Sequence, residues 1–409
     1  MRETHVFVQT MSSFAIAALL AACANPGSSG RVTLSSVVPD VQTRPLERPA
    51  GPDATVEYVY VTDSGSHSIN AYKINATSGA LTPINGLFST GNGPQAIAVD
   101  PAGKFAYVAN ANSDDVSADS INAATGALKK IAGAPFGAGP QPSGVAVDPS
   151  GKFAYVANFG FGVSSYGNVS AYTINATSGA LTQIFWSPFT AGTAPEAAVV
   201  DPKGKFVYVA NSASSNVSAF KINATSGALN QVSGSPFAAG YSPIAVVVDP
   251  TGKFAFVANQ SASASYGNVS VYQINATSGA LSQIPGSPFE AGSSPNDVVV
   301  DPTGKFAYVP DYFGRDVYAY KINATTGALT AVFGSPFSTG LGSQDMVVDP
   351  TGKFAYVVNR DGDNVSAFQI NTTSGALSPV SGSPFATGNQ PYAIAACRVT
   401  SGKCIPAPL

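Results

Sequence analysis

A six-residue phrase, Asp-Pro-x-Gly-Lys-Phe, recurs six times in the 409 residues and predicts an all-β fold, a seven-bladed β-propeller. The copies lie 48 to 53 residues apart and begin at Asp100, Asp148, Asp201, Asp249, Asp301 and Asp349. A period of about 50 residues with strand-like content is typical of propeller blades. Composition agrees, because 41 Gly and 30 Pro in a chain that is 44% hydrophobic indicate short strands joined by tight turns.

The unit that begins at Pro243 is predicted to form four antiparallel strands. Its first segment is almost wholly apolar, as expected of an innermost strand that is covered on both faces. In the turns, Pro presets φ, the Asp side chain accepts turn amides and Gly permits a positive φ. The expected elements are strands at 244–248, 254–259, 269–274 and 280–284, turns at 249–253 and 275–279, and a connection at 287–289. No stretch has helical periodicity.

The C-terminal strand is expected to close the ring. The second-strand motif occurs seven times, with its aromatic residue at Tyr60, Tyr107, Tyr155, Tyr208, Phe256, Tyr308 and Tyr356. The first copy has no inner strand before it, whereas 391–399 has an inner-strand pattern with only a tail after it. We therefore expect 391–399 to complete blade 1, so that the ring closes as three strands plus one and leaves no open sheet edge.

The N-terminus is expected to be a processing segment. A short apolar stretch ends in Leu20-Ala21-Ala22-Cys23, which resembles the bacterial lipobox and implies acylation of Cys23. By analogy with lipoprotein sorting, Ala24 favours the outer membrane of a bacterial cell envelope. We expect a signal peptide at 1–22, a flexible tether at 23–54, the propeller at 55–399 and a tail at 400–409. The alternative is an ordinary secretory signal with an incidental cysteine, and either Met1 or Met11 is the start.

The two remaining cysteines are Cys397 and Cys404. If Cys23 is acylated, these two are left as a pair in an oxidising compartment, where they are expected to form a disulfide. That bond would join the final strand to the tail.

Positions where the repeats disagree are the candidates for function. The turns Asp-Pro-x-Gly-Lys and Asn-Ala-Thr-Ser-Gly are nearly identical in every blade and fall on one face, while the loops on the opposite face differ. Two of those loops, 159–167 and 260–267, are insertions. Their aromatic residues, and that of the blade 6 loop, are candidates to stack on a sugar or another flat ligand: Tyr166, Tyr266 and Tyr312.

Residues at the starts of the inner strands are expected to meet at the mouth of the central channel, where a concave surface with a few polar groups is the default ligand site. The predicted ligand-binding residues are Gln95, Glu196, Asn296, Asp297, Gln344, Asp345 and Tyr392, with Arg315 and Arg360 at the rim. Loop drift on a solvated rim is the alternative. The carboxylates of Glu196, Asp297 and Asp345 are candidate oxygen ligands for Ca²⁺; no other cofactor is expected.

The second-strand motif also resembles a known family. Tyr60-Val61-Thr62-Asp63, and Tyr-Val-Ala-Asn at Tyr107, Tyr155 and Tyr208, resemble the signature of the YVTN-type β-propellers. These are grouped with lactonase-like seven-bladed propellers that include bacterial 6-phosphogluconolactonase. The resemblance covers roughly 56–399 and implies the propeller fold and a lactone hydrolase activity.

Few catalytic signals accompany that resemblance. His67 is the one histidine after the predicted signal peptide, and neither a Ser-His-Asp arrangement nor a Gly-x-Ser-x-Gly elbow is evident. We therefore expect first an envelope-anchored, non-catalytic propeller that binds through its variable face. The alternatives are a lactone hydrolase and a purely structural envelope protein.

The partner is expected to be a small molecule, a glycan or an envelope protein, and the chain a monomer that contacts the membrane through its lipid anchor alone. A net charge of -3 provides no electrostatic reason to bind nucleic acid.

We predict that Cys23→Ser moves the protein from the membrane fraction to the soluble fraction, because the substitution removes the thiol that would carry the acyl chains. Fractionation of cells that produce either form measures this. A variant that stays wholly with the membranes contradicts the lipobox assignment.

Overall fold

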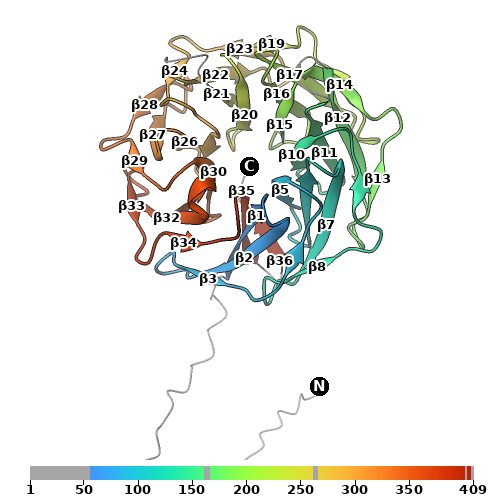
Figure 1. Ribbon diagram of the computed structural model, residues 1–409. Helices are drawn as coiled ribbons and strands as arrows, with labels where there is room; N and C mark the ends of the chain where they lie inside the picture. The colour runs from blue at the N-terminus through green and yellow to red at the C-terminus, as the bar shows by residue number, and fades with distance from the viewer. Residues whose placement is uncertain (1–55, 161–165, 261–265, 401–402, 407–409) are drawn as a thin grey trace, which may run out of the picture. The chain divides into compact units, whose positions relative to one another are not determined.

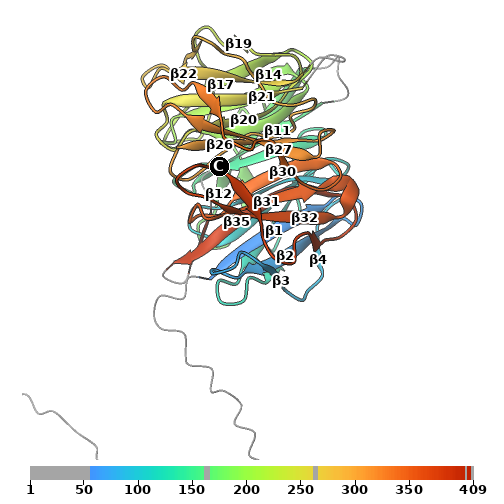
Figure 2. The same cartoon turned by 90° about the vertical axis from the view of Figure 1, so that its left-hand side faces the viewer.

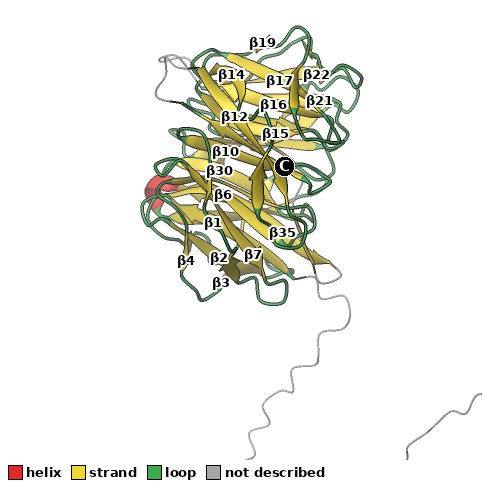
Figure 3. Ribbon diagram, turned by 90° about the vertical axis from the view of Figure 1, so that its right-hand side faces the viewer, coloured by secondary structure: helices red, strands yellow, loops and turns green. Residues whose placement is uncertain are grey.

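The computed structural model describes residues 56–160, 166–260, 266–400 and 403–406. In this part of the chain, seven antiparallel sheets stand around a central axis (Figure 1). The predicted seven-bladed all-β propeller is confirmed. Its single helical element among the described residues is one 3-10 turn, η1 (Arg360–Gly362), which is red among the yellow strands in Figure 3.

The predicted signal peptide (1–22), the tether (23–54) and the acylation site Cys23 lie outside the described residues. Within the described ranges, no helix has the length and apolarity needed to cross a bilayer.

One inner strand from each blade faces the central channel. Apart from Thr400 at the end of the last one, the residues of these strands are buried or half-buried, in keeping with their largely apolar sequence. In chain order they are β5 (Pro94–Val99), β10 (Pro142–Val147), β15 (Pro195–Val200), β20 (Pro243–Val248), β25 (Val299–Val300), β30 (Ser343–Val348) and β35 (Pro391–Thr400).

The second strand of every blade is buried along its whole length. These strands are β1 (Glu57–Asp63), β6 (Phe105–Asn110), β11 (Phe153–Asn158), β16 (Phe206–Asn211), β21 (Phe254–Asn259), β26 (Phe306–Asp311) and β31 (Phe354–Asn359). Their side chains pack between neighbouring blades in seven apolar clusters, one at each junction. The core of this protein is therefore a ring of seven interfaces.

The third strand of each blade alternates buried and more exposed side chains near its end, as a strand close to the rim should. The seven are β2 (Ser68–Ile74), β7 (Asp115–Ile121), β12 (Tyr166–Ile174), β17 (Asn216–Ile222), β22 (Asn268–Ile274), β27 (Asp316–Ile322) and β32 (Asn364–Ile370).

The outer strand is split into two pieces, which differs from the single strand and connection expected at 280–284 and 287–289. In blade 5, Leu281 pairs with Ile274 and Phe289 pairs with Val269, so both pieces flank β22. Pro288 has no N–H for a continuous ladder, and the Ser287 hydroxyl accepts the Val271 N–H (2.9 Å) in the gap.

The paired outer pieces are β3 (Leu81–Pro83) and β4 (Phe88–Ser89), β8 (Leu128–Lys130) and β9 (Phe136–Gly137), β13 (Leu181–Gln183) and β14 (Phe189–Thr193), β18 (Leu229–Gln231) and β19 (Phe237–Ala238), β23 (Leu281–Gln283) and β24 (Phe289–Glu290), β28 (Leu329–Ala331) and β29 (Phe337–Ser338), and β33 (Leu377–Pro379) and β34 (Phe385–Ala386).

Closure follows the predicted three-plus-one arrangement, with β35 against β1 in one sheet (Figure 2). The segment expected as a tail contributes a further strand, β36 (Lys403–Pro406), which pairs with β35. Cys397 on β35 is disulfide-bonded. Cys404 lies on β36 opposite Val399; its side chain lies outside the described residues, so its pairing with Cys397 stays a prediction.

Two side-chain turns repeat around the ring and explain the near-identical phrases. Asp249 Oδ1 accepts the N–H groups of Lys253 and Phe254 (both 2.7 Å), and the five other turn aspartates do the same. Asn275 Oδ1 accepts the N–H groups of Thr277 and Ser278 (both 3.0 Å). Each turn thereby satisfies backbone donors that the strands leave free.

A tyrosine hydroxyl of the second strand joins each blade to the next at six of the seven junctions. Tyr208, buried at 0% exposure, donates to the Gly279 carbonyl of the following blade (3.0 Å). Gly279 has φ +78°, and a Cβ there would lie 2.4 Å from the Phe206 ring, so only glycine fits. The equivalent donors are Tyr60, Tyr107, Tyr155, Tyr308 and Tyr356, whose bond to Gly79 closes the ring. Phe256 occupies the seventh position and has no hydroxyl.

We predict that Tyr208→Phe lowers the free energy of unfolding by about 1 kcal/mol, because a buried carbonyl loses its donor. Chemical denaturation of both proteins measures the difference.

The matched variant is Phe256→Tyr, which adds the second-strand hydroxyl at the one junction without it and should raise the unfolding free energy by up to about 1 kcal/mol. Unchanged stability in Tyr208→Phe would show that this bond does not stabilise the ring.

Candidate functional site

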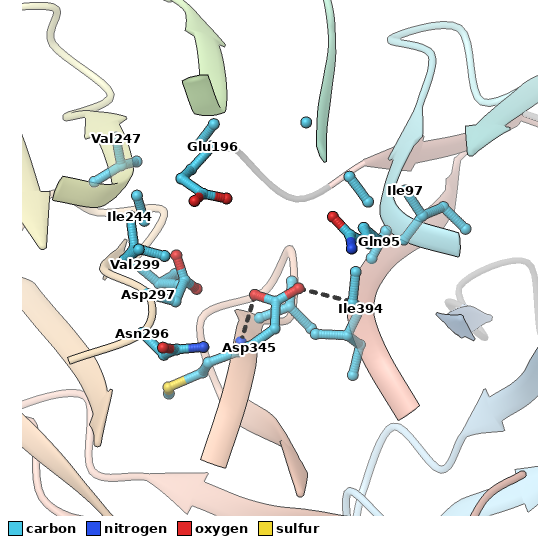
Figure 4. A pocket seen from close by; sticks show the side chains of 18 of the residues that line it. Gln95, Ile97, Glu196, Ile244, Val247, Asn296, Asp297, Val299, Asp345 and Ile394 are labelled. Atoms are coloured by element: carbon cyan, nitrogen blue, oxygen red, sulfur yellow. Dashed lines mark hydrogen bonds between the residues drawn. The ribbon is translucent and has the colours of Figure 1, made fainter. Parts of the chain in front are cut away.

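The described inner strands enclose one central cavity of about 220 Å³, to which all seven blades contribute. Its wall is mainly Ala, Val and Ile, with a few polar groups (Figure 4). Seven of the nine predicted ligand-binding residues line it: Gln95, Glu196, Asn296, Asp297, Gln344, Asp345 and Tyr392. The remaining two, Arg315 and Arg360, do not line this cavity.

A β-bulge at the start of the inner strands explains why these residues point into the channel. In blade 5 the register shifts between Pro243 and Ala245, which leaves Ile244 without a partner in the ladder. The same shift leaves Gln95, Glu196, Gln344 and Tyr392 unpaired. A bulged residue is free to point away from the sheet, and bulges are frequent beside functional sites.

Blade 6 departs from this pattern. Its second strand carries Pro310, which has no N–H to donate to the inner strand. The Asn296 N–H still reaches the Pro310 carbonyl (3.0 Å), but β25 is reduced to Val299–Val300. Asp297 therefore lies outside the ladder, where its carboxyl group is free to turn toward blade 7.

Asp297 and Asp345 form a carboxyl pair on the cavity wall. Asp345 accepts the N–H of Met346 at Oδ1 (2.7 Å) and the N–H of Ile394 at Oδ2 (2.9 Å), drawn as dashed lines in Figure 4. Burial, then the charge of Asp297, raises the pKa of Asp345 well above its usual range, and burial also raises the pKa of Asp297. Two adjacent carboxyls with little access to water do not both ionise readily, so this arrangement favours the protonated form of one of them.

Glu196 lies on a different wall and turns its carboxylate toward the same space (Figure 4). Its Oε1 accepts a hydrogen bond from the Ser212 hydroxyl (3.0 Å). Burial raises the pKa of Glu196 to about 7, and the bond from Ser212 opposes that rise. The cavity thus contains one isolated carboxyl group with a pKa raised to about 7 and a carboxyl pair in which both pKa values are raised.

The binding of Ca²⁺ by the three carboxyls stays a prediction. Among the described residues, no three His, Cys, Asp or Glu side chains are placed to hold a metal ion. Glu196, Asp297 and Asp345 all line the cavity, but they divide into one isolated group and one pair.

Polar contacts between blades orient the other lining residues. Gln260 Nε2 donates to Asn296 Oδ1 (2.8 Å), and Asn296 Nδ2 donates to the Gln344 carbonyl (3.5 Å). These contacts link blades 5, 6 and 7 beside the carboxyl pair.

Arg315, Arg360 and Tyr312 lie outside the cavity lining, at the rim of the propeller. Arg360 lies over the ring of Tyr392, with Cζ 5.2 Å from the ring centroid, and burial raises the pKa of Tyr392 to about 12. Arg315 is exposed in a turn of blade 6. The Tyr312 hydroxyl donates to Asp361 Oδ2 (2.9 Å).

Neither Tyr266 nor His67 lines the cavity. Tyr266 is 67% exposed, and the side chain of Tyr166 lies outside the described residues. His67 Nδ1 accepts the Gly93 N–H (3.2 Å), as expected of a polar loop residue.

Two contributors to the site are absent from the predicted set. Ser212 has no special sequence context, and only its position beside Glu196 identifies it. Pro310 did carry a signal, because proline inside a strand that is otherwise regular in seven copies marks a broken ladder.

Comparison with known proteins agrees with this architecture. The family model for lactonases with a seven-bladed β-propeller matches residues 31–248 and 281–395. No curated protein matches the chain.

Solved structures share the fold at low sequence identity. A protein from Bacteroides fragilis described as a 6-phosphogluconolactonase has a TM-score of 0.71 and 20% identity, over 86% of this chain and 100% of its own. The periplasmic gluconolactonase PpgL of Pseudomonas aeruginosa has a TM-score of 0.70 and 16% identity, over 84% of this chain and 99% of its own. The structural likeness shows the fold, and the family model, which spans most of the sequence, shows that the chain belongs to the lactonase family of seven-bladed β-propellers.

Proposed function

We propose that this protein hydrolyses a lactone in its central cavity by general acid–base catalysis. One observation carries the proposal: Glu196, which titrates near neutrality, faces the proton-holding pair Asp297 and Asp345 across one cavity (Figure 4). Membership of the lactonase family favours hydrolysis over the non-catalytic binding role that we expected first.

The two carboxyl systems suit the two demands of the reaction. In lactone hydrolysis, water adds to the carbonyl carbon, and the bond from that carbon to the ring oxygen then breaks. Ionised Glu196 can accept the proton that the attacking water loses. The proton shared by Asp297 and Asp345 can donate a hydrogen bond to the carbonyl oxygen, where negative charge develops. Glu196 can then return its proton to the departing ring oxygen, which restores the starting state and yields a hydroxy acid.

The cavity fits a neutral sugar lactone better than a phosphorylated one. Its described lining includes no Lys, Arg or His side chain, and the carboxyl groups would repel a phosphate. Gln95, Asn296 and Tyr392 offer hydrogen bonds to sugar hydroxyls. Since similar structures bear the names of both a 6-phosphogluconolactonase and a gluconolactonase, we propose an unphosphorylated sugar δ-lactone as the substrate class.

Purified protein tests both statements when it is offered a neutral sugar δ-lactone and its phosphorylated counterpart, with acid release followed at constant pH. We expect turnover of the neutral lactone. Turnover of the phosphorylated form alone would overturn the substrate class, and no turnover of any lactone would overturn the activity.

We also propose that the activity resides in the cell envelope, because the sequence up to Cys23 resembles a lipoprotein leader. There the chain would act as a monomer on a small molecule, without nucleic acid and without a cofactor.

We predict that Glu196→Gln lowers kcat by about 10²- to 10⁴-fold, because the amide cannot accept a proton from water. In the unsubstituted enzyme, kcat should rise with pH through about 7, where Glu196 ionises. The variant should lose that dependence.

Ser212→Ala is the matched control for this assignment. It removes the hydrogen bond that opposes the rise in the pKa of Glu196, so the same kinetic step should move to higher pH without a comparable loss of kcat. A Glu196→Gln enzyme with full activity and an unchanged pH profile would exclude Glu196 as the base.

We predict that Asp297→Asn gains thermal stability over the unsubstituted protein as the pH rises. The pKa of Asp297 is higher in the folded protein than its usual value of about 3.9, so the folded state loses stability as the pH rises through the folded value. Asparagine cannot ionise and avoids that loss.

The difference in melting temperature between the two proteins is measured at pH 4.5 and at pH 8. An effect of the amide that does not depend on pH contributes equally to both differences and cancels. A difference between the two proteins that does not grow from pH 4.5 to pH 8 would contradict the shared proton.

A further inference from the structure

The outer turn of blade 3 exposes two aromatic residues. Phe185 and Trp186 stand between β13 and β14 and are 76% and 78% exposed. Figure 1 shows these strands at the outer rim of the ring. Trp186 is the one tryptophan of the chain, and the catalytic cavity does not involve it.

The backbone of Trp186 is unusual for a bulky residue. Its φ is +71°, in the left-handed region that side chains disfavour. The corresponding turn residue in the other six blades is a glycine with positive φ: Gly86, Gly133, Gly234, Gly286, Gly334 and Gly382. Blade 3 therefore has a large aromatic residue where the repeat calls for glycine, and neither folding nor the cavity requires one there.

The position presents its side chain to solvent. A Cβ built on Gly234 or Gly334 would come no closer than 3.6 Å to another residue, and one on Gly286 would meet nothing within 4 Å. A residue at this point in the turn thus projects away from the blade. Burial cannot account for the indole ring of Trp186.

The turn is also held rigidly. The Ile184 N–H donates to the Ala171 carbonyl (2.8 Å), and the Ser187 hydroxyl accepts the Ala171 N–H (2.8 Å). The rings of Phe185 and Trp186 meet edge to face, with centroids 4.5 Å apart at 65°. Two rings fixed in this way lose little conformational freedom when a ligand binds.

The sequence around the pair is polar but uncharged. No charged residue occurs between Lys152 and Glu196 in the sequence. Thr173 lies opposite Thr182 at the position where blades 1, 4 and 6 carry a lysine. Beside the turn, Gln183 Nε2 lies 3.4 Å from the Ser187 hydroxyl. The platform thus offers amide and hydroxyl groups around two apolar faces.

We propose that Phe185 and Trp186 form a binding platform for a neutral carbohydrate, separate from the catalytic cavity. The C–H faces of a pyranose ring pack against the electron-rich faces of aromatic rings, and its hydroxyls can bond to Gln183 and Thr182. The absence of charge in this stretch matches a sugar without carboxylate, sulfate or phosphate groups.

The size and charge of the patch favour a sugar over other partners. Two aromatic side chains bury about 150–250 Å² each, far below the ~1,200 Å² of a stable protein interface. An anionic bilayer is attracted by clustered Lys and Arg, which this stretch of sequence does not contain.

Because Trp186 is the one tryptophan of the chain, tryptophan fluorescence measures binding at this site directly. We expect saturable changes in the fluorescence of the full-length protein on titration with at least one neutral hexasaccharide of glucose, mannose or N-acetylglucosamine. Calorimetry with the same saccharide then compares the variants. Trp186→Gly should abolish binding, and Phe185→Ala should weaken it about tenfold.

Trp186→Gly is expected to fold, because glycine occupies this turn position in the other six blades. Its melting temperature and its activity in the cavity should equal or exceed those of the unsubstituted protein. Phe333→Ala is the matched control, since Phe333 is 99% exposed at the equivalent point of blade 6 but is followed by Gly334; binding should not change.

Three results would overturn the proposal. One is the absence of any fluorescence change with all three saccharides, and another is full binding by Trp186→Gly. The third is a fluorescence change with zwitterionic phosphatidylcholine vesicles but with none of the saccharides, which would indicate a lipid-facing residue. None of these results bears on lactone hydrolysis.

Discussion

The hydrogen bond from a buried tyrosine to a glycine carbonyl of the next blade is the contact on which the ring depends. It joins the second strand of one blade to the outer turn of its neighbour. The bond from Tyr356 to Gly79 joins the last blade to the first. Because the hydroxyl lies in an apolar junction, its loss would leave a buried carbonyl without a partner. The contact explains why the second strand carries tyrosine, while the close approach of the phenylalanine ring to the turn explains the glycine.

A ring held in this way leaves its inner strands free to vary. The ladder needs the backbone of each inner strand, but it does not need the bulged side chain at its start. Blade 6 goes further, since Pro310 removes a donor and reduces the inner strand to two residues. Asp297 gains the freedom to reach Asp345 from this break. The carboxyl pair of the cavity therefore arises where the repeat is least regular, while the apolar core lies at the junctions between blades.

Much of this arrangement could be predicted from the sequence, because comparison of the repeat copies separates the positions that they share from the positions at which they differ. The turn aspartates, the closing strand 391–399 and the residues that converge on the channel all follow from comparing copies. The pairing of Asp297 with Asp345 does not, since it depends on how closely two blades approach. The position of Arg360 over Tyr392 depends on side-chain packing within the rim. The split outer strand was missed because a proline before a phenylalanine reads equally well as a connection.

The bulges at the inner-strand starts have a consequence for how such a protein can acquire new specificities. Four bulged positions project one side chain into the cavity without supplying a side chain to the blade junctions, whereas Tyr392 packs against a junction cluster and the Ser143 hydroxyl donates to the Pro195 carbonyl of the next blade. Gln95, Glu196, Ile244 and Gln344 can thus be exchanged one at a time, and the scaffold need not be redesigned with each change. Substitutions at these few positions would change which ligand the cavity binds, while the backbone that positions each side chain stays the same.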